Sequence, residues 1–288
     1  MSLPATFVPG FHNEEAVRKM QYNPLGNTGL KISKIGFGGA ALGGRFLFGE
    51  YEEAEGIATV HEALKQGINF IDTAPYYGQG RSEELLGKAL KGVPRKAYYI
   101  ATKVARYEMD ILTRFDFSKE KTLWSVDNSL KKLGLDYVDI IQTLPALASV
   151  VQAGKARYIG ITCHTLSVLK EAIQRSPVPI STVLSYARNT LIDDSLLTFV
   201  PYFQDHGIEL AKLAQYHTMS SPGPATQLVG MNNRKELQAN IDVAVIGLTD
   251  LEQQVLKDIK SKFLDKLKPT HWEGFEVKQY EEALKQKK

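Results

Sequence analysis

The sequence predicts an α/β fold built on a parallel sheet, because short apolar runs alternate with helical patterns from Lys34 onward. The runs are apolar at nearly every position, which is typical of strands covered on both faces. A doubly wound sheet and a (β/α)8 barrel both satisfy that pattern. We expect seven strands, at residues 34–39, 68–74, 98–104, 137–142, 156–162, 182–187 and 226–231.

The crossover helices are indicated by residues at their ends. Ser82 stands before two glutamates, Ser118 opens an amphipathic segment, and Asn233 has a glutamate three residues on, so each is expected to cap a helix. The chain contains no linker or low-complexity segment. We therefore expect one barrel domain over residues 1–288, with an N-terminal extension at 1–20 and a C-terminal helical segment at 246–288.

Composition limits the classes of function. The chain has 288 residues, of which 43% are hydrophobic and 23% charged, and its net charge is +3. Basic residues are dispersed, so no nucleic-acid partner is predicted, and no run approaches the roughly 18 apolar residues of a membrane span. Cys163 is the only cysteine, which fits a reducing compartment. These features predict a cytoplasmic protein without a metal site, and they specify no oligomeric state.

The glycine-rich segment "GFGGAALGG", residues 36–44, has the form of a dinucleotide-binding turn after a strand. A Rossmann turn requires a helix to begin inside it and an acidic residue about 20 positions further on. Gly43 and Gly44 interrupt such a helix, and the next strand ends later, at Asp72. The segment therefore favours a plain glycine loop over a Rossmann site.

Three residues capable of acid–base chemistry stand at or just after predicted strand ends. Asp72 ends the second strand, Tyr77 follows in its loop, and Lys103 ends the third strand. Taken singly, they could be a hydrogen-bond acceptor, a packing aromatic and a surface ammonium. In a barrel, however, the ends of all strands converge on one mouth, where functional residues gather.

Together these residues would form a proton donor. A phenol is a poor acid at neutral pH, but an adjacent ammonium stabilises the phenolate and a carboxylate can hold that ammonium in place. Asp72 would then hold the Lys103 ammonium in place, Lys103 would lower the pKa of the Tyr77 phenol, and Tyr77 would donate the proton. Such a donor suits the reduction of a carbonyl, in which hydride reaches carbon while the phenol protonates the alkoxide.

At these residues the chain resembles the aldo-keto reductases. The resemblance is carried by "DTAPYYGQG" (72–80), "ATKV" (101–104), "SLKKLGLDYVDIIQ" (129–142), "GKARYIGIT" (154–162) and "LVGMNNRKELQANIDVA" (228–244). Within the family, it is closest to the aldose and L-galactose dehydrogenase group. The resemblance implies a (β/α)8 barrel closed at its N-terminal end by a small hairpin, NADP or NAD as cofactor, and a small carbonyl or sugar substrate.

Carried over residue by residue, the resemblance assigns Asp72, Tyr77 and Lys103 to three of the four catalytic positions. It places Thr162 and Ser185 near the nicotinamide, and the 230–240 segment around the adenosine and its phosphate, at a strand leading to a helix N-terminus. The candidate cofactor-binding residues are Gly38, Gly39, Thr162, Ser185, Gly230, Asn232, Gln238 and Asn240.

Two apparent deletions depart from the family pattern. After Gln142 the family continues to a catalytic histidine, which is missing here, and after Ile208 it has another strand, so seven strands are expected where a closed barrel has eight. His164 could replace the lost histidine or could be an ordinary loop residue. Three interpretations follow: an active NAD(P)-dependent reductase, a catalytically impaired barrel with a binding or regulatory role, and, least favoured, a Rossmann dehydrogenase.

Overall fold

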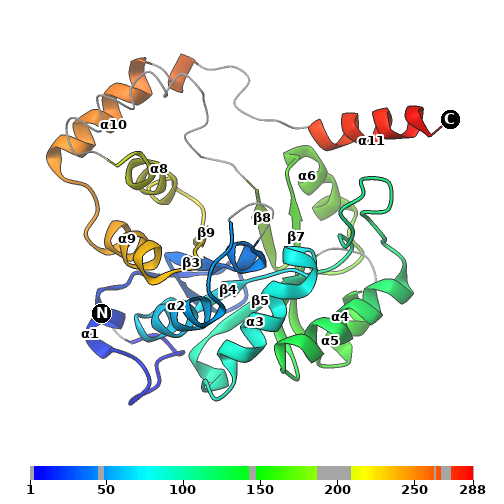
Figure 1. Cartoon of the computed structure of the whole chain (residues 1–288), viewed down its shortest axis with the longest axis horizontal. Coiled ribbons are helices and arrows are strands. Elements are labelled where there is room, and N and C mark those ends of the chain that lie inside the picture. The colour runs from blue at the N-terminus through cyan, green and yellow to red at the C-terminus, as the bar shows by residue number, and fades with distance from the viewer. Residues whose placement is uncertain are drawn as a thin grey trace.

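A computed structural model describes residues 3–44, 49–142, 147–186, 209–262, 264–266 and 274–287 of the chain. These residues form a curled parallel sheet with helices around it (Figure 1). The strands follow the order β8-β7-β6-β5-β4-β3-β9. Their bounds are β3 Ile35–Gly38, β4 Phe70–Asp72, β5 Tyr99–Lys103, β6 Val138–Gln142, β7 Ala156–Cys163, β8 Thr182–Ser185 and β9 Gln227–Gly230.

All seven predicted strands are confirmed, and every pair in this sheet is parallel. Within the described residues the sheet is open, with β8 and β9 at its edges. Residues 187–208 lie outside the described residues. The described part of β6 ends at Gln142 and that of the following helix begins at Leu147, and residues 143–146 between them also lie outside that set.

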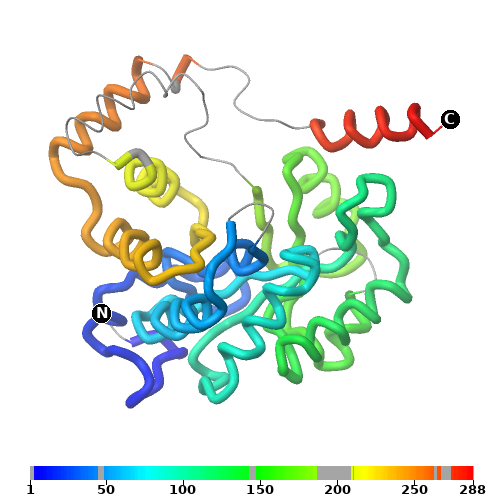
Figure 2. Tube along the Cα trace, in the orientation of Figure 1, coloured from blue at the N-terminus to red at the C-terminus, as the bar shows by residue number. Residues whose placement is uncertain are grey.

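The helices alternate with the strands as expected. They are α1 Glu14–Lys19, α2 Glu53–Lys65, α3 Arg81–Leu90, α4 Lys119–Leu133, α5 Leu147–Gln152, α6 Leu166–Arg175, α8 Leu210–Met219, α9 Arg234–Val245, α10 Asp250–Lys262 and α11 Phe275–Gln286. None of them is long and apolar enough to cross a membrane. Figure 2 shows the two chain ends at opposite sides of the molecule.

Two of the three predicted helix caps are confirmed. Ser118 accepts a hydrogen bond from the Lys121 amide, and Asn233 accepts one from the Glu236 amide. The prediction for Ser82 was wrong, because α3 already begins at Arg81 and the Ser82 hydroxyl donates instead to the carbonyl of Gly39. A tertiary partner outcompetes the local cap at this position.

The glycine-rich segment forms β3 and the short 3-10 helix η1, Gly39–Gly43, rather than the start of an α-helix. This geometry agrees with the argument against a Rossmann turn. Gly43 lies against Gly78, where a Cβ on Gly43 would be 2.7 Å from the Gly78 amide nitrogen. The glycine is needed for this close backbone approach between two loops.

An antiparallel hairpin of β1, Tyr22–Pro24, and β2, Lys31–Ser33, precedes the sheet. Its residues Leu30 and Ile32 pack in one buried cluster with Phe70, Ala101 and Ile140, which come from β4, β5 and β6. The hairpin therefore covers the apolar interior of the curled sheet, as the resemblance implied. Burial is deepest in β3 to β6, whereas Val183 in the edge strand β8 remains 51% exposed.

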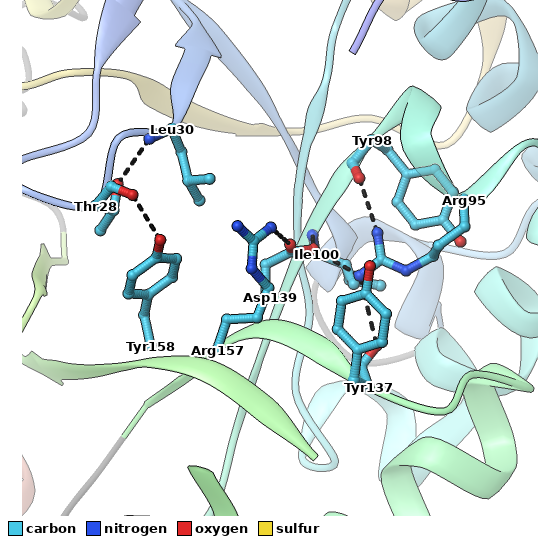
Figure 3. A network of polar contacts seen from close by, with 9 residues as sticks. All are labelled: Thr28, Leu30, Arg95, Tyr98, Ile100, Tyr137, Asp139, Arg157 and Tyr158. Carbon is cyan, nitrogen blue, oxygen red and sulfur yellow. Dashed lines mark hydrogen bonds and ion pairs between the residues drawn. The ribbon is translucent and has the colours of Figure 1, made fainter. Parts of the chain in front are cut away.

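A polar network ties three strands together beneath this hairpin (Figure 3). Asp139 of β6 is 1% exposed, and its carboxylate accepts from Arg95 at 2.7 Å, from Arg157 at 2.9 Å and from the Ile100 amide at 3.0 Å. The neighbouring Tyr158 hydroxyl donates to the carbonyl of Thr28 in the hairpin. Three donors compensate the burial of this carboxylate, which the sequence analysis did not identify.

We predict that Asp139→Ala lowers the free energy of unfolding by about 2 to 3 kcal/mol. The substitution leaves the buried Ile100 amide without its acceptor and removes the shared partner of Arg95 and Arg157. The loss stays below that of a fully buried pair because both arginine side chains are partly exposed, at 25% and 43%, and can regain water. Denaturant-induced unfolding measures the change.

The matched control is Asp127→Ala, which removes an exposed carboxylate paired with Lys155. An exposed pair contributes at most about 1 kcal/mol, so this variant should unfold almost like the wild type. Equal destabilisation by the two substitutions would show that the buried Asp139 network contributes no more to the free energy of unfolding than an exposed ion pair does.

Candidate active site

Four polar residues meet where the central strands end. Asp72 is the last residue of β4, Lys103 of β5 and Gln142 of β6, while Tyr77 opens the short 3-10 helix η2, Tyr77–Gly80, after β4. Lys103 and Gln142 are register partners in adjacent strands. The parallel sheet thus brings the three predicted catalytic residues together at the C-terminal ends of its strands, as the convergence of barrel strands requires.

Asp72 and Lys103 form a buried ion pair. The Lys103 ammonium donates to the Asp72 carboxylate and to the carbonyl oxygen of Thr73, the latter at 3.0 Å. Gln142 Nε2 donates to the second carboxylate oxygen of Asp72 at 3.0 Å. The Asp72 carboxylate and the ammonium are thereby held from several sides.

The Tyr77 ring lies beside this ammonium, with Lys103 Nζ 5.0 Å from the ring centroid. The turn that presents it is tightly wound: Gly78, Gln79 and Gly80 all have positive φ, at 62°, 55° and 98°. Gln79 adopts this conformation without being glycine, which is strain of a kind that clusters at functional sites. Glycine at positions 78 and 80 allows the positive φ angles that this turn requires.

Burial raises the pKa of the Tyr77 phenol, and the Lys103 ammonium opposes that rise without reversing it. The predicted effect of Lys103, which is to lower this pKa, is therefore confirmed in direction, but burial outweighs it and the pKa stays above its ordinary value. Sequence alone could not show how strongly the phenol is desolvated. At neutral pH the phenol is a protonated acid.

The two groups of the ion pair influence each other's pKa. Burial lowers the pKa of Lys103, but Asp72 and then Tyr77 outweigh this and raise it above its ordinary value. Burial raises the pKa of Asp72, opposed by Lys103 and Gln142. The site thus combines a neutral phenol with an ammonium whose charge favours the phenolate.

Tyr76 has a different environment from its neighbour. The Arg106 guanidinium lies 4.3 Å from the centre of its ring, and Arg106 also pairs with Glu276 at the start of α11. Tyr76 is thus in contact with a guanidinium that is itself paired with α11. This supports a packing role for Tyr76.

Of the candidate cofactor residues, Thr162 lies near the end of β7 and Ser185 ends β8, where it is paired with Cys163. Ser185 Oγ is buried and has no hydrogen-bond partner among the described residues, and the same is true of Gln142 Oε1. Buried polar atoms normally have partners. Two such atoms at the mouth therefore fit a site built to receive a polar ligand.

The remaining candidates are largely occupied by the protein itself. Gly38 and Gly230 are register partners, and Gly39 lies against Ser82 and the Asp72 carbonyl. Gln238 bonds to Gln66 and Asp242, while the Asn232 amide donates to Glu236 and the Asn240 side chain contacts Met231. Close packing accounts for glycine at positions 38 and 39, where a Cβ would lie 3.0 Å or less from neighbouring atoms.

An acid also stands at the first turn of α9. Glu55 of α2 accepts from the Arg234 backbone amide at 3.0 Å and pairs with the Arg234 guanidinium at 3.0 Å. The sequence analysis missed this contact. A carboxylate therefore already interacts with the positive end of the helix at which the resemblance placed the adenosine phosphate.

The aromatic ring of Tyr186, just past β8, is a second feature that sequence reasoning missed. It is 57% exposed, contacts the His164 ring edge-on at 4.4 Å, and is close enough to influence the pKa of Tyr77. An aromatic residue following a strand end in "VLSYA" was the available signal. His164 is half-buried against this ring rather than a fully exposed loop residue.

Comparison with known proteins decides the family. The model of the Aldo/keto reductase family matches residues 34–187. The chain belongs to the aldo/keto reductase family. It is therefore an oxidoreductase of a family that uses NAD(P)H. The matched region includes the four polar residues at the mouth of the sheet: Asp72, Tyr77, Lys103 and Gln142.

The L-galactose dehydrogenase of Arabidopsis thaliana is 33% identical, with 88% of this chain and 97% of that protein aligned. That alignment has 318 positions, more than the 288 residues here, so it must open gaps in this chain. The NADH-specific methylglyoxal reductase of Escherichia coli is 30% identical over 66% of this chain and 65% of that protein.

Among solved structures, the holo form of the aldo-keto reductase AKR11C1 from Bacillus halodurans matches with a TM-score of 0.62 and 27% identity. The match covers 83% of this chain and 96% of that structure. The curled sheet described above is thus the sheet of an aldo/keto reductase barrel, described here with seven strands.

We predict that Lys103→Met moves the basic limb of the pH profile for carbonyl reduction to higher pH and lowers the rate. Without the ammonium, nothing offsets the burial of the Tyr77 phenol, so its pKa rises further and the phenol stays protonated to higher pH. Measurement of kcat against pH tests this.

Lys121→Met is the matched control, because Lys121 Nζ also lies 5.0 Å from a tyrosine ring, that of Tyr107, away from Asp72. Its pH profile should match that of the wild type. An unmoved limb in Lys103→Met would rule out coupling between the ammonium and the phenol.

Proposed function

We propose that this chain interconverts a carbonyl compound and an alcohol with NAD or NADP, using Tyr77 as the acid and base. One observation carries the proposal: Lys103 is held between the Asp72 carboxylate and the Tyr77 ring at the ends of adjacent strands. Family membership supports the hydride chemistry, and the geometry supports the identity of the proton donor.

In this mechanism a bound nicotinamide supplies or accepts the hydride. Tyr77 donates its hydroxyl proton to the oxygen that becomes the alcohol, and it takes a proton back in the reverse direction. Lys103 stabilises the phenolate that remains. Asp72, fixed by Gln142, and the Thr73 carbonyl hold the ammonium so that little reorganisation is needed during the reaction.

For the cofactor, we propose that Thr162 and Ser185 hold the nicotinamide carboxamide and that the Gly230–Asn240 segment holds the adenosine end. The unpartnered Ser185 hydroxyl supports the first assignment. At the adenosine end, Glu55 pairs with Arg234 at the start of α9. The additional ribose phosphate of NADP would be repelled by this carboxylate. We therefore propose NAD as the preferred cofactor.

For the substrate, we propose a small sugar-like carbonyl or hydroxyl compound. The support is the 33% identity over most of the chain with a relative named L-galactose dehydrogenase. Turnover of a panel of aldoses and small aldehydes by the purified chain tests this proposal. Activity with simple aldehydes but none with aldoses would reject the sugar class.

A second candidate function is binding without turnover, for example in regulation. Two observations favour it: the described sheet is open between β8 and β9, and no histidine follows β6 before Leu147. A histidine there would orient the substrate carbonyl by a hydrogen bond. Cofactor titration by fluorescence, combined with the substrate panel, separates this candidate from the enzyme.

We predict that Tyr77→Phe lowers kcat for carbonyl reduction at least about 100-fold, because a general acid contributes roughly that factor. Tyr76→Phe is the matched control and should retain activity, since its ring packs against Arg106 and stays in place. Full activity in Tyr77→Phe, with loss in Tyr76→Phe, would reverse the assignment.

We also predict that NADH raises the melting temperature of the chain by several degrees at about 100 times its dissociation constant, and that NADPH raises it less. The reason is the Glu55 carboxylate beside Arg234. Glu55→Gln should narrow the difference by removing that charge. Thermal melting with each cofactor measures the effect.

A larger shift with NADPH than with NADH would contradict the preference for NAD. No shift with either cofactor, together with no turnover, would contradict cofactor binding altogether. If turnover is present, its loss in His164→Ala would identify His164 as a substitute for the missing histidine, and its retention would leave His164 a packing partner of Tyr186.

A further inference from the structure

The first turn of α3 buries two consecutive polar residues. Ser82 and Glu83 both have no exposed surface. A helix that covers a sheet ordinarily turns polar side chains of its first turn toward water. Burying a carboxylic acid side chain is costly: burial raises the pKa of Glu83, and the Thr102 and Ser129 hydroxyls oppose that rise without reversing it. Stability alone therefore gives little reason for a glutamate here.

Each of the two residues forms hydrogen bonds with residues at the C-terminal ends of the central strands. The Ser82 hydroxyl donates to the Gly39 carbonyl at 2.7 Å and is 2.9 Å from the Thr73 hydroxyl. Glu83 Oε1 accepts from the Thr102 hydroxyl at 2.7 Å. Gly39 follows β3, Thr73 follows β4, and Thr102 lies in β5, so one helical turn is tied to three strands.

The partners are the immediate neighbours of the candidate catalytic residues. Thr73 follows Asp72, and Thr102 precedes Lys103. Tyr77 opens the η2 turn that leads into α3 at Arg81. A shift of α3 along the sheet would therefore move the phenol relative to the ammonium, while the ion pair itself stays within the sheet.

We propose that Ser82 and Glu83 are positioning residues, which hold the Tyr77 phenol against the Lys103 ammonium by fastening the first turn of α3 to β3, β4 and β5. The proposal rests on the proposed role of Tyr77 as the acid. It assigns to the "RSEE" segment a function beyond covering the sheet. A displacement of about 1 Å at a reacting group can cost on the order of 100-fold in rate.

The experiment compares Thr102→Val, which removes the hydroxyl bonded to Glu83, with Thr102→Ser, which retains one. Ser82→Ala breaks the other contact independently. Glu84→Gln is the control, since Glu84 lies on the exposed side of the same turn and pairs with Lys132. Thermal melting of each variant reports whether it folds.

The first readout is the pKa of the Tyr77 phenol, followed by NMR of isotope-labelled tyrosine and assigned with Tyr77→Phe. Thr102→Val and Ser82→Ala should raise this pKa because the phenol is no longer held beside the ammonium. Thr102→Ser and Glu84→Gln should leave it where it is in the wild type. An unchanged phenol pKa in both disrupting variants would overturn the proposal.

The second readout is steady-state kinetics. We expect kcat to fall between about 10-fold and 100-fold in Thr102→Val with little change in the KM of the cofactor, and to be restored in Thr102→Ser. A fall that merely follows the folded fraction would overturn the proposal. If the wild type has no turnover, a shifted phenol pKa still supports positioning, whereas the proposed function itself then fails.

Discussion

The buried ion pair of Asp72 and Lys103 is the interaction around which the mouth of this sheet is organised. A carboxylate that is 2% exposed is stable in its charged form only if donors surround it, and Lys103 and Gln142 supply them from the next two strands. The requirement fixes β4, β5 and β6 relative to one another. It also fixes the place of the ammonium, and with it the one position where a phenol gains from that charge.

Polar contacts at the two ends of the central strands serve different purposes. At the N-terminal end Asp139 has three donors, and the network closes the sheet beneath the hairpin. At the C-terminal end some polar atoms lack partners, as Gln142 Oε1 and Ser185 Oγ do. The Asp139 carboxylate therefore has its donors within the protein, whereas Gln142 Oε1 and Ser185 Oγ are free to accept from a ligand.

The sequence predicted the features that depend on local pattern. Continuous apolar runs located all seven strands, and the order of strands and helices brought Asp72, Tyr77 and Lys103 to one edge. What it could not predict depends on contacts distant in the sequence. The Ser82 hydroxyl looked like a cap because Gly39, its true partner, lies 43 positions away. Asp139 was missed because its donors come from three separate segments, and the raised pKa of Tyr77 follows from burial that no motif encodes.

The open sheet divides the candidate site into two parts with different support. Asp72, Tyr77 and Lys103 come from β4, β5 and the loop after β4, where burial is deepest and each strand has neighbours on both sides. Thr162, Ser185 and Gly230 come from β7, β8 and β9, which lie at or next to the edges, and edge strands lose hydrogen bonds and packing on one side. Among the described strands, the proposed cofactor residues therefore lie on less fully paired strands than the phenol and its ammonium. Acid–base geometry and cofactor binding are for this reason separable properties of this chain.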